Sequence, residues 1–255
     1  MWQTDVLGDG WQSRTIDLRR DGDQPAVATL VRREPSAPGR RRAVLYVHGY
    51  VDYFFQKHLG DAWDAWGYDF YALDLRGYGR SLLPHQVPND VADLATYSEE
   101  LDAAARIIRA EEGHDTLVAL GHSTGGLVVS LWAHARRGRA DGPVVDAVVL
   151  NSPWFDLNRG WFDRVVLTRL VDLVAPLAPH LVIGQTGRFY GEWLHQPDGG
   201  GWEFSQDWKP DAGFGVRAGW FRAIRRGHRA VAAGLAIDVP VLVCAATASG
   251  PRSEE

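Results

Sequence analysis

One ten-residue stretch, Leu117 to Gly126, reads LVALGHSTGG and constrains the fold more than any other part of the chain. It opens with four apolar residues, as a buried strand does, and leads into a helical pattern over residues 127–131. A G-x-S-x-G sequence at a strand-to-helix junction places its serine on a tight turn, with the hydroxyl clear of the sheet. Gly121 and Gly125 are needed because a Cβ atom at either position would collide across that turn. We therefore predict that Ser123 is a nucleophile.

The size and charge of the chain limit the classes of protein to which it can belong. Its 255 residues are enough for one α/β domain with a sizeable core. The formal net charge of −5 gives no reason to expect nucleic acid as a partner. A short basic run, Arg40 to Arg42, directly precedes an apolar strand, and we interpret it as a solvated strand edge.

Targeting and redox signals indicate a cytoplasmic protein. The N-terminal sequence MWQTDVLGDG has neither the basic nor the apolar region of a signal peptide. No apolar run approaches the ~18 residues of a membrane helix, so we predict no integral membrane segment. Cys244 is the only cysteine, which excludes an internal disulfide and fits a reducing compartment. Since Cys244 lies in an apolar strand, we expect it to be a packing residue.

Apolar runs of strand length alternate with helical patterns along most of the chain. A polar turn between two short β-type runs predicts a hairpin at the edge of the sheet, over residues 13–18 and 26–31. Further strands are predicted at 42–47, 68–73, 117–120, 144–150 and 240–245, and helices at 54–66, 94–113, 124–137 and 218–233. Such alternation predicts a mostly parallel β-sheet with helices on its faces.

The composition changes after residue 153, which predicts an insertion. Residues 154–219 are rich in Trp, Phe, Gly and Pro and lack clear periodicity over much of their length. A segment this long is typical of a functional lid or small subdomain. We therefore divide the chain into an N-terminal core part (1–153), a lid (154–219) and a C-terminal core part (220–255). Aromatic residues of the lid either pack it onto the core or line an apolar substrate cleft: Trp154, Trp161, Phe189, Tyr190, Trp193, Trp202 and Trp208.

Four motifs in chain order carry a resemblance to a known family. They are YVHGY (46–50), DLRGYGRS (74–81), GHSTGG (121–126) and NSPW (151–154). Together they resemble the α/β-hydrolase fold, and within it the group of monoacylglycerol lipases, lysophospholipases and serine aminopeptidase-like enzymes. The resemblance implies a mostly parallel sheet flanked by helices, with an inserted lid. It also implies a serine hydrolase that forms an acyl-serine intermediate.

The resemblance also assigns roles around Ser123. The backbone N–H groups of Tyr50 and Thr124 would form the oxyanion hole, which stabilises the charge of the tetrahedral intermediate. His48–Gly49 would shape the loop that carries the Tyr50 donor. His122 is an unsuitable base because adjacent side chains diverge on a tight elbow.

The acid and base of a serine triad do not stand where the fold usually places them. In this fold the triad order is serine, acid, histidine. The usual acid position, beyond the strand at 240–245, is occupied by Ser249, and the last histidine is His228. We expect a C-terminally truncated chain in which the last strand and helix are missing, with acid and base beyond Glu255. Without them, the chain is expected to be nearly inactive.

Two alternatives to truncation remain open. The chain could be complete and non-catalytic, as a ligand-binding or interaction protein on a hydrolase scaffold. A rearranged triad would instead use Asp156 as the acid, with a base from His180, His195 or His228. We interpret each of these four residues as a surface or packing residue.

The predicted substrate is a small carboxylic ester with an apolar acyl chain, such as a monoacylglycerol or lysophospholipid. The alternative substrate is an amide or N-terminal peptide, as for an aminopeptidase, which would require a carboxylate facing the substrate's ammonium group. Candidates for that carboxylate are Glu192, Asp198 and Glu203. The sequence contains no metal-ligand cluster and no dinucleotide fingerprint, so we predict no metal and no cofactor. It makes no prediction of the oligomeric state.

Overall fold

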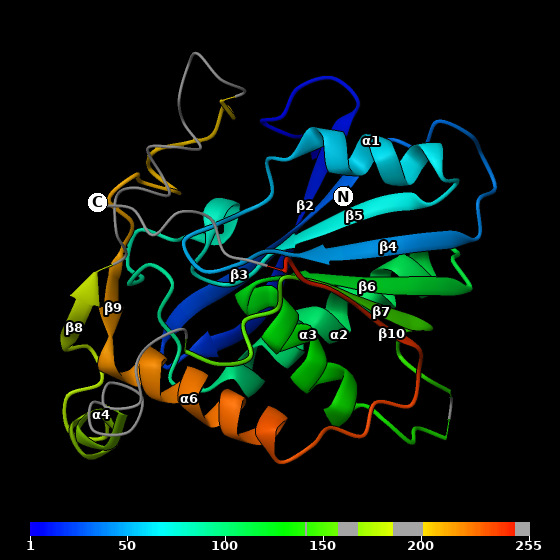
Figure 1. Cartoon of the computed structure of the whole chain (residues 1–255). Coiled ribbons are helices and arrows are strands. Elements are labelled where there is room, and N and C mark those ends of the chain that lie inside the picture. The colour runs from blue at the N-terminus through cyan, green and yellow to red at the C-terminus, as the bar shows by residue number, and fades with distance from the viewer. Residues whose placement is uncertain (141, 158–167, 186–200, 248–255) are drawn as a thin grey trace.

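A central β-sheet runs through the molecule, with helices on both of its faces (Figure 1). The computed structural model describes residues 1–140, 142–157, 168–185 and 201–247. Within these residues the sheet has eight strands in the order β1-β2-β3-β5-β4-β6-β7-β10. The strands are β1 (Gln3–Thr4), β2 (Trp11–Asp21), β3 (Gln24–Arg33), β4 (Arg42–Val47), β5 (Asp69–Asp74), β6 (Thr116–His122), β7 (Ala147–Asn151) and β10 (Val241–Cys244).

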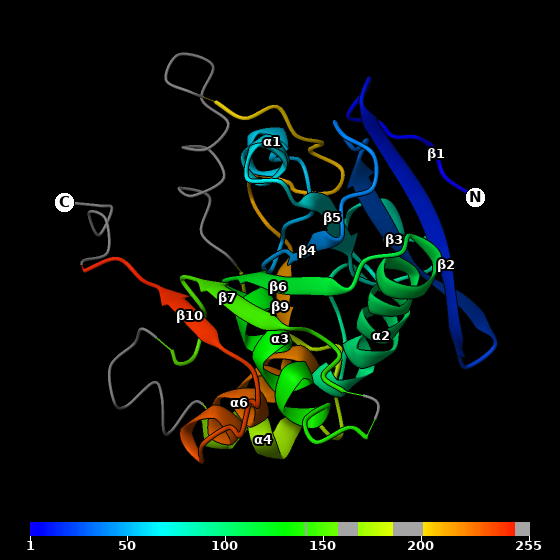
Figure 2. The ribbon, with the colours of Figure 1, turned by 90° about the vertical axis from the view of Figure 1, so that its right-hand side faces the viewer.

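Two layers of helices cover this sheet. Helix α1 packs on one face, whereas α2, α3 and α6 pack on the other, where the larger hydrophobic core lies (Figure 2). The helices are α1 (Lys57–Ala65), α2 (Ser98–Arg106), α3 (Thr124–Ala135), α4 (Thr168–Val174) and α6 (Ala218–Ala232). Shorter helical turns are η1 (Gly79–Ser81), η2 (Leu94–Tyr97) and η3 (Ile107–Glu111).

The sheet is antiparallel at its N-terminal edge and parallel elsewhere. The neighbouring strands are antiparallel from β1 through β2 and β3 to β5. From β5 through β4, β6 and β7 to β10 they are parallel. Strand β4 lies between β5 and β6, and its residues Ala43 to Val47 are all buried. Continuous apolar strands of this kind need cover on both faces, which α1 and α3 help to provide. The predicted fold class, an α/β sheet flanked by helices, is confirmed.

Most predicted elements form, with shifted boundaries. The edge hairpin is confirmed as β2 and β3, whose pairing includes Thr15 with Thr29. The helix predicted at 54–66 begins only at Lys57, because Phe54 is already buried in the preceding loop and its N–H donates to Asp74. The single helix predicted at 94–113 consists of a 3₁₀ turn, an α-helix and a π-helical turn.

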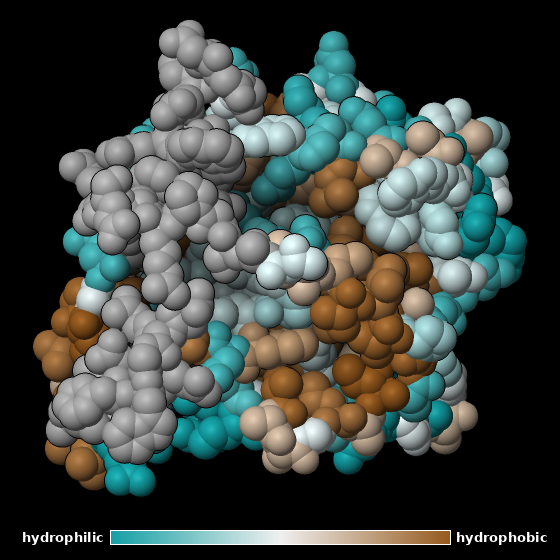
Figure 3. Space-filling view, in the orientation of Figure 1, coloured by the Kyte–Doolittle hydropathy of each residue, from teal (hydrophilic) through white to brown (hydrophobic). Residues whose placement is uncertain are grey.

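Strand β10 forms, but the prediction that its Cys244 is a packing residue was wrong. Its residues Val241, Leu242 and Val243 are 41%, 58% and 52% exposed, and Cys244 is also exposed. The reason is that β10 pairs with β7 on one side only and is the last strand of the sheet in the described part of the chain. Figure 3 shows the resulting hydrophobic patch in brown.

Part of the predicted lid lies beyond the ends of the parallel strands (Figure 1). There, β8 (Val182–Gln185) and β9 (Gly215–Arg217) form a separate antiparallel pair that leads into α6. The boundaries 154–219 stay a prediction, since much of that segment lies outside the described residues. None of the helices in the described ranges has the length and apolar character of a membrane span.

Candidate active site

Ser123 lies at the junction of β6 and α3 in a backbone conformation that is rare for a non-glycine residue. Its φ is 52° and its ψ is −116°. Three backbone hydrogen bonds help to fix this turn: Ser123 N–H donates to Asn151 O at 3.1 Å, while the N–H groups of Gly126 and Trp154 donate to Ser123 O at 3.0 and 2.9 Å. A strained residue held in this way is typical of a functional site.

The glycines around Ser123 allow close approach of backbone segments. A Cβ atom on Gly121 would lie 2.7 Å from the Gly125 carbonyl oxygen, across the turn. A Cβ atom on Gly125 would strike the carbonyl oxygens of Val47, the last residue of β4, and of His48, the first residue of the loop after it. The glycines therefore bring the start of α3 directly against that loop.

A pocket opens at Ser123. It brings together the site residues predicted from sequence, namely Gly49, Tyr50, His122 and Thr124. Residues that the sequence analysis did not assign to the site complete its lining: Asp52, Ser152 and Lys209, with Trp154 from the lid. Ser152, like Ser123, has a positive φ, at 46°.

The ring of His48 is buried in the loop after β4, and its hydrogen bonds fix its tautomer. Its Nε2 atom accepts a hydrogen bond from Leu75 N–H at 3.1 Å, so the ring proton is on Nδ1. Nδ1 therefore donates to the carbonyl oxygen of Gly49, at 2.8 Å. That carbonyl and the Tyr50 N–H belong to one planar trans peptide and point in opposite directions. His48 thus orients the amide of Tyr50.

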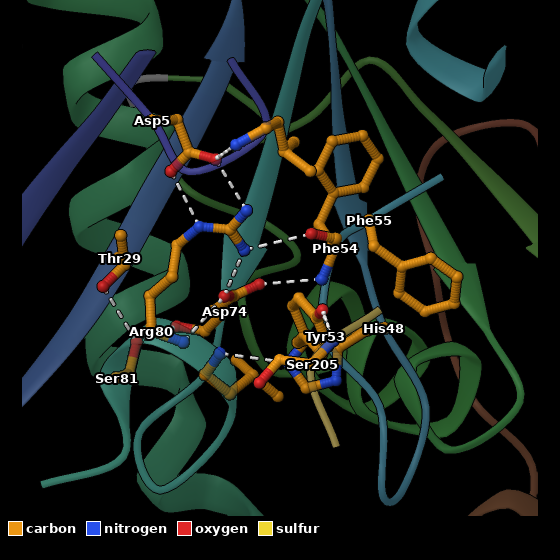
Figure 4. Close-up of polar contacts among 12 residues, drawn as sticks. Asp5, Thr29, His48, Tyr53, Phe54, Phe55, Asp74, Arg80, Ser81 and Ser205 are labelled. Atoms are coloured by element: carbon orange, nitrogen blue, oxygen red, sulfur yellow. Dashed lines mark hydrogen bonds and ion pairs between the residues drawn. The ribbon is translucent and has the colours of Figure 1, made fainter. Parts of the chain in front are cut away.

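An ion-pair network also contacts the loop after β4 (Figure 4). The guanidinium of Arg80 binds the carboxylates of Asp5 and Asp74, each at 2.7 Å, and donates to the carbonyl of Phe54 at 3.0 Å. Burial raises the pKa of the Asp5 carboxyl, but hydrogen bonds and charge from Arg80 outweigh it, so the pKa lies below its ordinary value. The network connects the N-terminal segment, the loop after β5 and the loop after β4.

Sequence reasoning missed a charged pair, Asp52 and Lys209, in the Ser123 pocket. Lys209 Nζ lies 3.0 Å from Asp52 Oδ1, and both side chains are 7% exposed. The pair does not meet hydrogen-bond geometry, and within the described residues Asp52 Oδ1 accepts no hydrogen bond. Asp52 could have been suspected, since it follows the HGY motif by two residues, whereas no local pattern points to Lys209.

His122 lines the pocket beside Ser123. Burial lowers the pKa of its ring; the nearby Asp52 carboxylate opposes this shift and the Lys209 ammonium adds to it. His122 is therefore neutral at pH 7. No carboxylate of the described chain accepts a hydrogen bond from it.

Two of the other histidines considered from sequence, His180 and His228, belong to the described residues, and both lie away from the pocket lining. His228 in α6 donates through Nε2 to the Trp154 carbonyl at 3.0 Å, and its Nδ1 accepts from Arg225 at 3.0 Å. Asp156 pairs with Arg225 at 3.1 Å. His180 is mostly exposed and pairs with Asp90 at 2.8 Å. Neither His228, His180 nor Asp156 lines the Ser123 pocket.

Of the lid aromatics, Trp154 lines the Ser123 pocket and Trp202 lines a second pocket that shares Asp52, His122 and Lys209 with the first. Trp208 packs edge-on against Tyr53. Glu203 is exposed and lines neither pocket. The remaining residues singled out from sequence lie outside the described ranges: Trp161, Phe189, Tyr190, Glu192, Trp193, His195, Asp198, Ser249 and Glu255.

This combination of parallel sheet, glycine-lined elbow and serine pocket coincides with a family match. Residues 38–249 match the model of the family described as "Serine aminopeptidase, S33". The chain belongs to this family of α/β hydrolases. A search of curated proteins found no match to this chain. In the described ranges, no group of three or more His, Cys, Asp or Glu side chains could hold a metal ion.

Solved structures share the fold of this S33 family member. One is a soluble variant of monoglyceride lipase from Saccharomyces cerevisiae, in complex with a substrate analogue. Its TM-score is 0.65 at 19% identity, with 90% of this chain and 75% of the lipase covered. Another is a thermostable carboxyl esterase from Bacillus coagulans in complex with glycerol, with a TM-score of 0.57 at 11% identity and coverage of 90% and 78%. At these identities the likeness shows the α/β-hydrolase fold alone.

Proposed function

We propose that this chain is a serine hydrolase whose nucleophile is Ser123 and whose substrates are small carboxylic esters. The hydroxyl would attack the ester carbonyl, the alcohol would leave, and water would then release the acid from the acyl-serine. The observation that carries the proposal is the strained elbow: Ser123 adopts φ 52° at the N-terminus of α3 and lines a pocket with Tyr50 and Thr124.

The oxyanion would be stabilised by the backbone N–H groups of Tyr50 and Thr124. Support for this role comes from His48, which binds the Gly49 carbonyl and so sets the direction of the Tyr50 N–H. Thr124 is the first residue of α3, where N–H groups have no partner within the helix and the helix dipole favours negative charge. Two such donors are worth about 2.7–4 kcal/mol each in a hydrolase transition state.

The pocket favours an uncharged substrate next to Ser123. Asp52 lines it and would attract the ammonium group of an aminopeptidase substrate, but Lys209 already neutralises Asp52 at 3.0 Å. An incoming ammonium group would have to displace Lys209. A neutral substrate avoids this competition, because it needs no counter-ion from Asp52. We therefore propose an ester with an apolar acyl chain and a hydroxyl-bearing alcohol, as in a monoacylglycerol, or a lysophospholipid.

The rate of turnover depends on a general base that the proposal leaves unassigned. In the described ranges, His122 is the histidine of the Ser123 pocket, and no carboxylate there orients its ring. A serine hydrolase without its oriented base keeps only about 10³–10⁴ of acceleration over water, from oxyanion stabilisation and substrate binding. We therefore expect slow turnover.

The test is reaction with a fluorophosphonate probe, followed by mass spectrometry of the labelled peptide. The label should fall on Ser123 and be absent from the Ser123→Ala variant, which should also lose hydrolysis of p-nitrophenyl butyrate. The matched control is Ser130→Ala in the same helix, whose hydroxyl donates to Gly126 O at 2.7 Å and does not line the pocket. Hydrolysis that survives unchanged in Ser123→Ala would refute the proposal.

The family description also makes an aminopeptidase the second candidate. The two are distinguished by comparing p-nitrophenyl butyrate with alanine p-nitroanilide, a substrate that carries a free ammonium group. Faster release from the anilide would favour the aminopeptidase. If neither is cleaved and Ser123 is unlabelled, the scaffold is a non-catalytic binding protein.

A further inference from the structure

The loop that carries the Tyr50 amide contains a strained residue, Val51. Its φ is 48° and it is buried. β-branched residues rarely adopt positive φ, because the branched side chain crowds the backbone in that conformation. Such a conformation persists only where neighbouring contacts fix it.

The ammonium group of Lys209 makes a contact of this kind. Its Nζ donates to the Val51 carbonyl oxygen at 3.0 Å and lies 3.0 Å from Asp52 Oδ1. The two residues are 158 positions apart in the chain. A buried ammonium group needs hydrogen-bond acceptors and a compensating negative charge. Here the carbonyl oxygen and the carboxylate come from consecutive residues of one loop.

The segment around Lys209 contacts the same loop at two further points. The N–H of Ser205 donates to the Tyr53 hydroxyl at 2.7 Å, a contact drawn in Figure 4. The Tyr50 hydroxyl lies 3.4 Å from the Gly215 carbonyl, to which it donates. Contacts from residues 205–215 therefore span the loop from Tyr50 to Tyr53.

The two carbonyls that flank Tyr50 and Val51 are thus both held by side chains. His48 binds the carbonyl of Gly49, and Lys209 binds the carbonyl of Val51. The peptide planes on both sides of these residues are fixed, so the Tyr50 N–H has little freedom to turn. The elements that hold them differ, since His48 belongs to the loop itself and Lys209 to the segment that precedes β9.

We propose that Lys209 is a positioning residue for the oxyanion hole, and that it acts by holding Val51 in its positive-φ conformation. The proposal rests on the proposed function, in which the Tyr50 N–H stabilises the oxyanion. A lysine suits this position because its compact ammonium can reach one carbonyl and one carboxylate, which a planar guanidinium matches less well. The chain has 27 Lys and Arg residues, of which only Lys57 and Lys209 are lysines.

The first test compares Lys209→Met with Lys57→Met. Methionine keeps the unbranched stem and removes the ammonium group. The kcat for p-nitrophenyl butyrate and the fluorophosphonate labelling rate of Ser123 should both fall about tenfold in Lys209→Met, below the ~10²–10³ for loss of a whole donor. KM should change less than about twofold, because the ester's ground state does not use the oxyanion hole. Lys57→Met, at an exposed lysine, controls for the loss of one positive charge.

The second test is rescue by Val51→Gly. Glycine adopts positive φ without steric cost, so it should not need Lys209 to hold it there. In the Lys209→Met background, Val51→Gly should restore at least about a third of the lost labelling rate. A general loss of packing around Lys209 would not be repaired by removing a side chain from Val51, so absence of rescue overturns the proposal.

A third measurement keeps this proposal separate from the proposed function. Amide hydrogen exchange, followed on peptides that cover residues 48–55, should rise in Lys209→Met and stay at the wild-type level in Lys57→Met. If wild-type Ser123 does not label, the proposed function fails, and the exchange data still decide whether Lys209 fixes the loop. Unchanged exchange in Lys209→Met, or a raised KM with unchanged kcat, overturns the positioning role.

Discussion

The Nε2 atom of His48 accepts a hydrogen bond from the backbone N–H of Leu75 at 3.1 Å, and this contact ties the loop after β4 to the loop after β5. It forces the ring proton onto Nδ1, which then donates to the Gly49 carbonyl. One buried ring therefore has two separable duties. Its Nε2 side satisfies a backbone donor, and its Nδ1 side orients the peptide that carries the Tyr50 amide.

Two substitutions of His48 should separate these duties. The asparagine amide of His48→Asn can replace Nδ1 and donate to the Gly49 carbonyl, but it is too short to accept from the Leu75 N–H. The longer glutamine of His48→Gln can replace Nε2 and accept from the Leu75 N–H. We expect His48→Asn to lose about 1–3 kcal/mol of unfolding free energy, because the Leu75 N–H stays buried without a partner. His48→Gln should instead lose more of the fluorophosphonate labelling rate at Ser123. Urea denaturation and labelling kinetics measure the two effects, and equal losses of rate in both variants would contradict this division.

Ser123→Gly should stabilise the fold while removing reactivity. Ser123 adopts φ 52° and ψ −116°, a region that costs a residue with a Cβ about 1–3 kcal/mol, and glycine avoids this cost. Part of the gain is offset by the greater chain entropy of glycine when unfolded, so we expect a net gain of about 1 kcal/mol. Ser123→Ala is the matched control, since it removes the hydroxyl but keeps the strain. Equal unfolding midpoints for the two variants would show that the elbow is unstrained.

The elbow could be predicted from sequence because its signals are local. Gly121 and Gly125 flank a serine between an apolar strand and a helical pattern, and the structure places all three where the motif requires. Periodicity likewise predicts the order of the main strands and helices from β2 to β10, but it does not predict β1, α4, β8 or β9. The boundaries of the elements were harder to predict. Phe54, for example, continues an apolar pattern that looks helical, but it lies in the loop before α1.

Features that depend on distant partners could not be predicted. Lys209 reaches Val51 and Asp52 across more than 150 positions, and its segment has no periodicity to suggest a buried side chain. Strand β10 shows the opposite error: its apolar residues suggested burial, yet burial requires a neighbour, and in the described residues it has one on the β7 side only. Apolar character predicts a tendency to be covered, not the element that covers it.

Gly125→Ala should disturb the fold and the proposed oxyanion hole together. The added Cβ would strike the carbonyl oxygens of Val47 and His48, which are backbone atoms and cannot rotate away. We expect a loss of about 1–3 kcal/mol of unfolding free energy, as for other overpacked sites, and a slower labelling of Ser123. Gly184→Ala is the control, because a Cβ there would meet no atom within 4 Å. Wild-type stability and reactivity in Gly125→Ala would contradict the close contact between α3 and the backbone at Val47 and His48.

The buried ring of His228 should make stability depend on pH. Burial, with a smaller contribution from the Arg225 charge, lowers its pKa from 6.5 to about 4. Both of its hydrogen bonds suit the neutral ring: Arg225 donates to Nδ1, and Nε2–H donates to the Trp154 carbonyl.

The sign of this dependence follows from which state binds the proton. Below pH 6.5 the unfolded chain protonates His228, while the folded chain keeps the ring neutral until the pH approaches about 4. Protons therefore favour the unfolded state, and the contribution of His228 is fully present above pH 6.5 and lost as the pH falls towards 4. The loss at the lower end is on the order of 3 kcal/mol.

The difference between wild type and His228→Gln isolates this effect from the other titrating groups. Glutamine can still donate to the Trp154 carbonyl but binds no proton in this range. Unfolding free energies from urea titrations at pH 7.5, 6.5, 5.5 and 4.5 should therefore fall more steeply in the wild type than in the variant. Parallel stability curves for the two proteins would show that His228 becomes protonated without cost in the folded state.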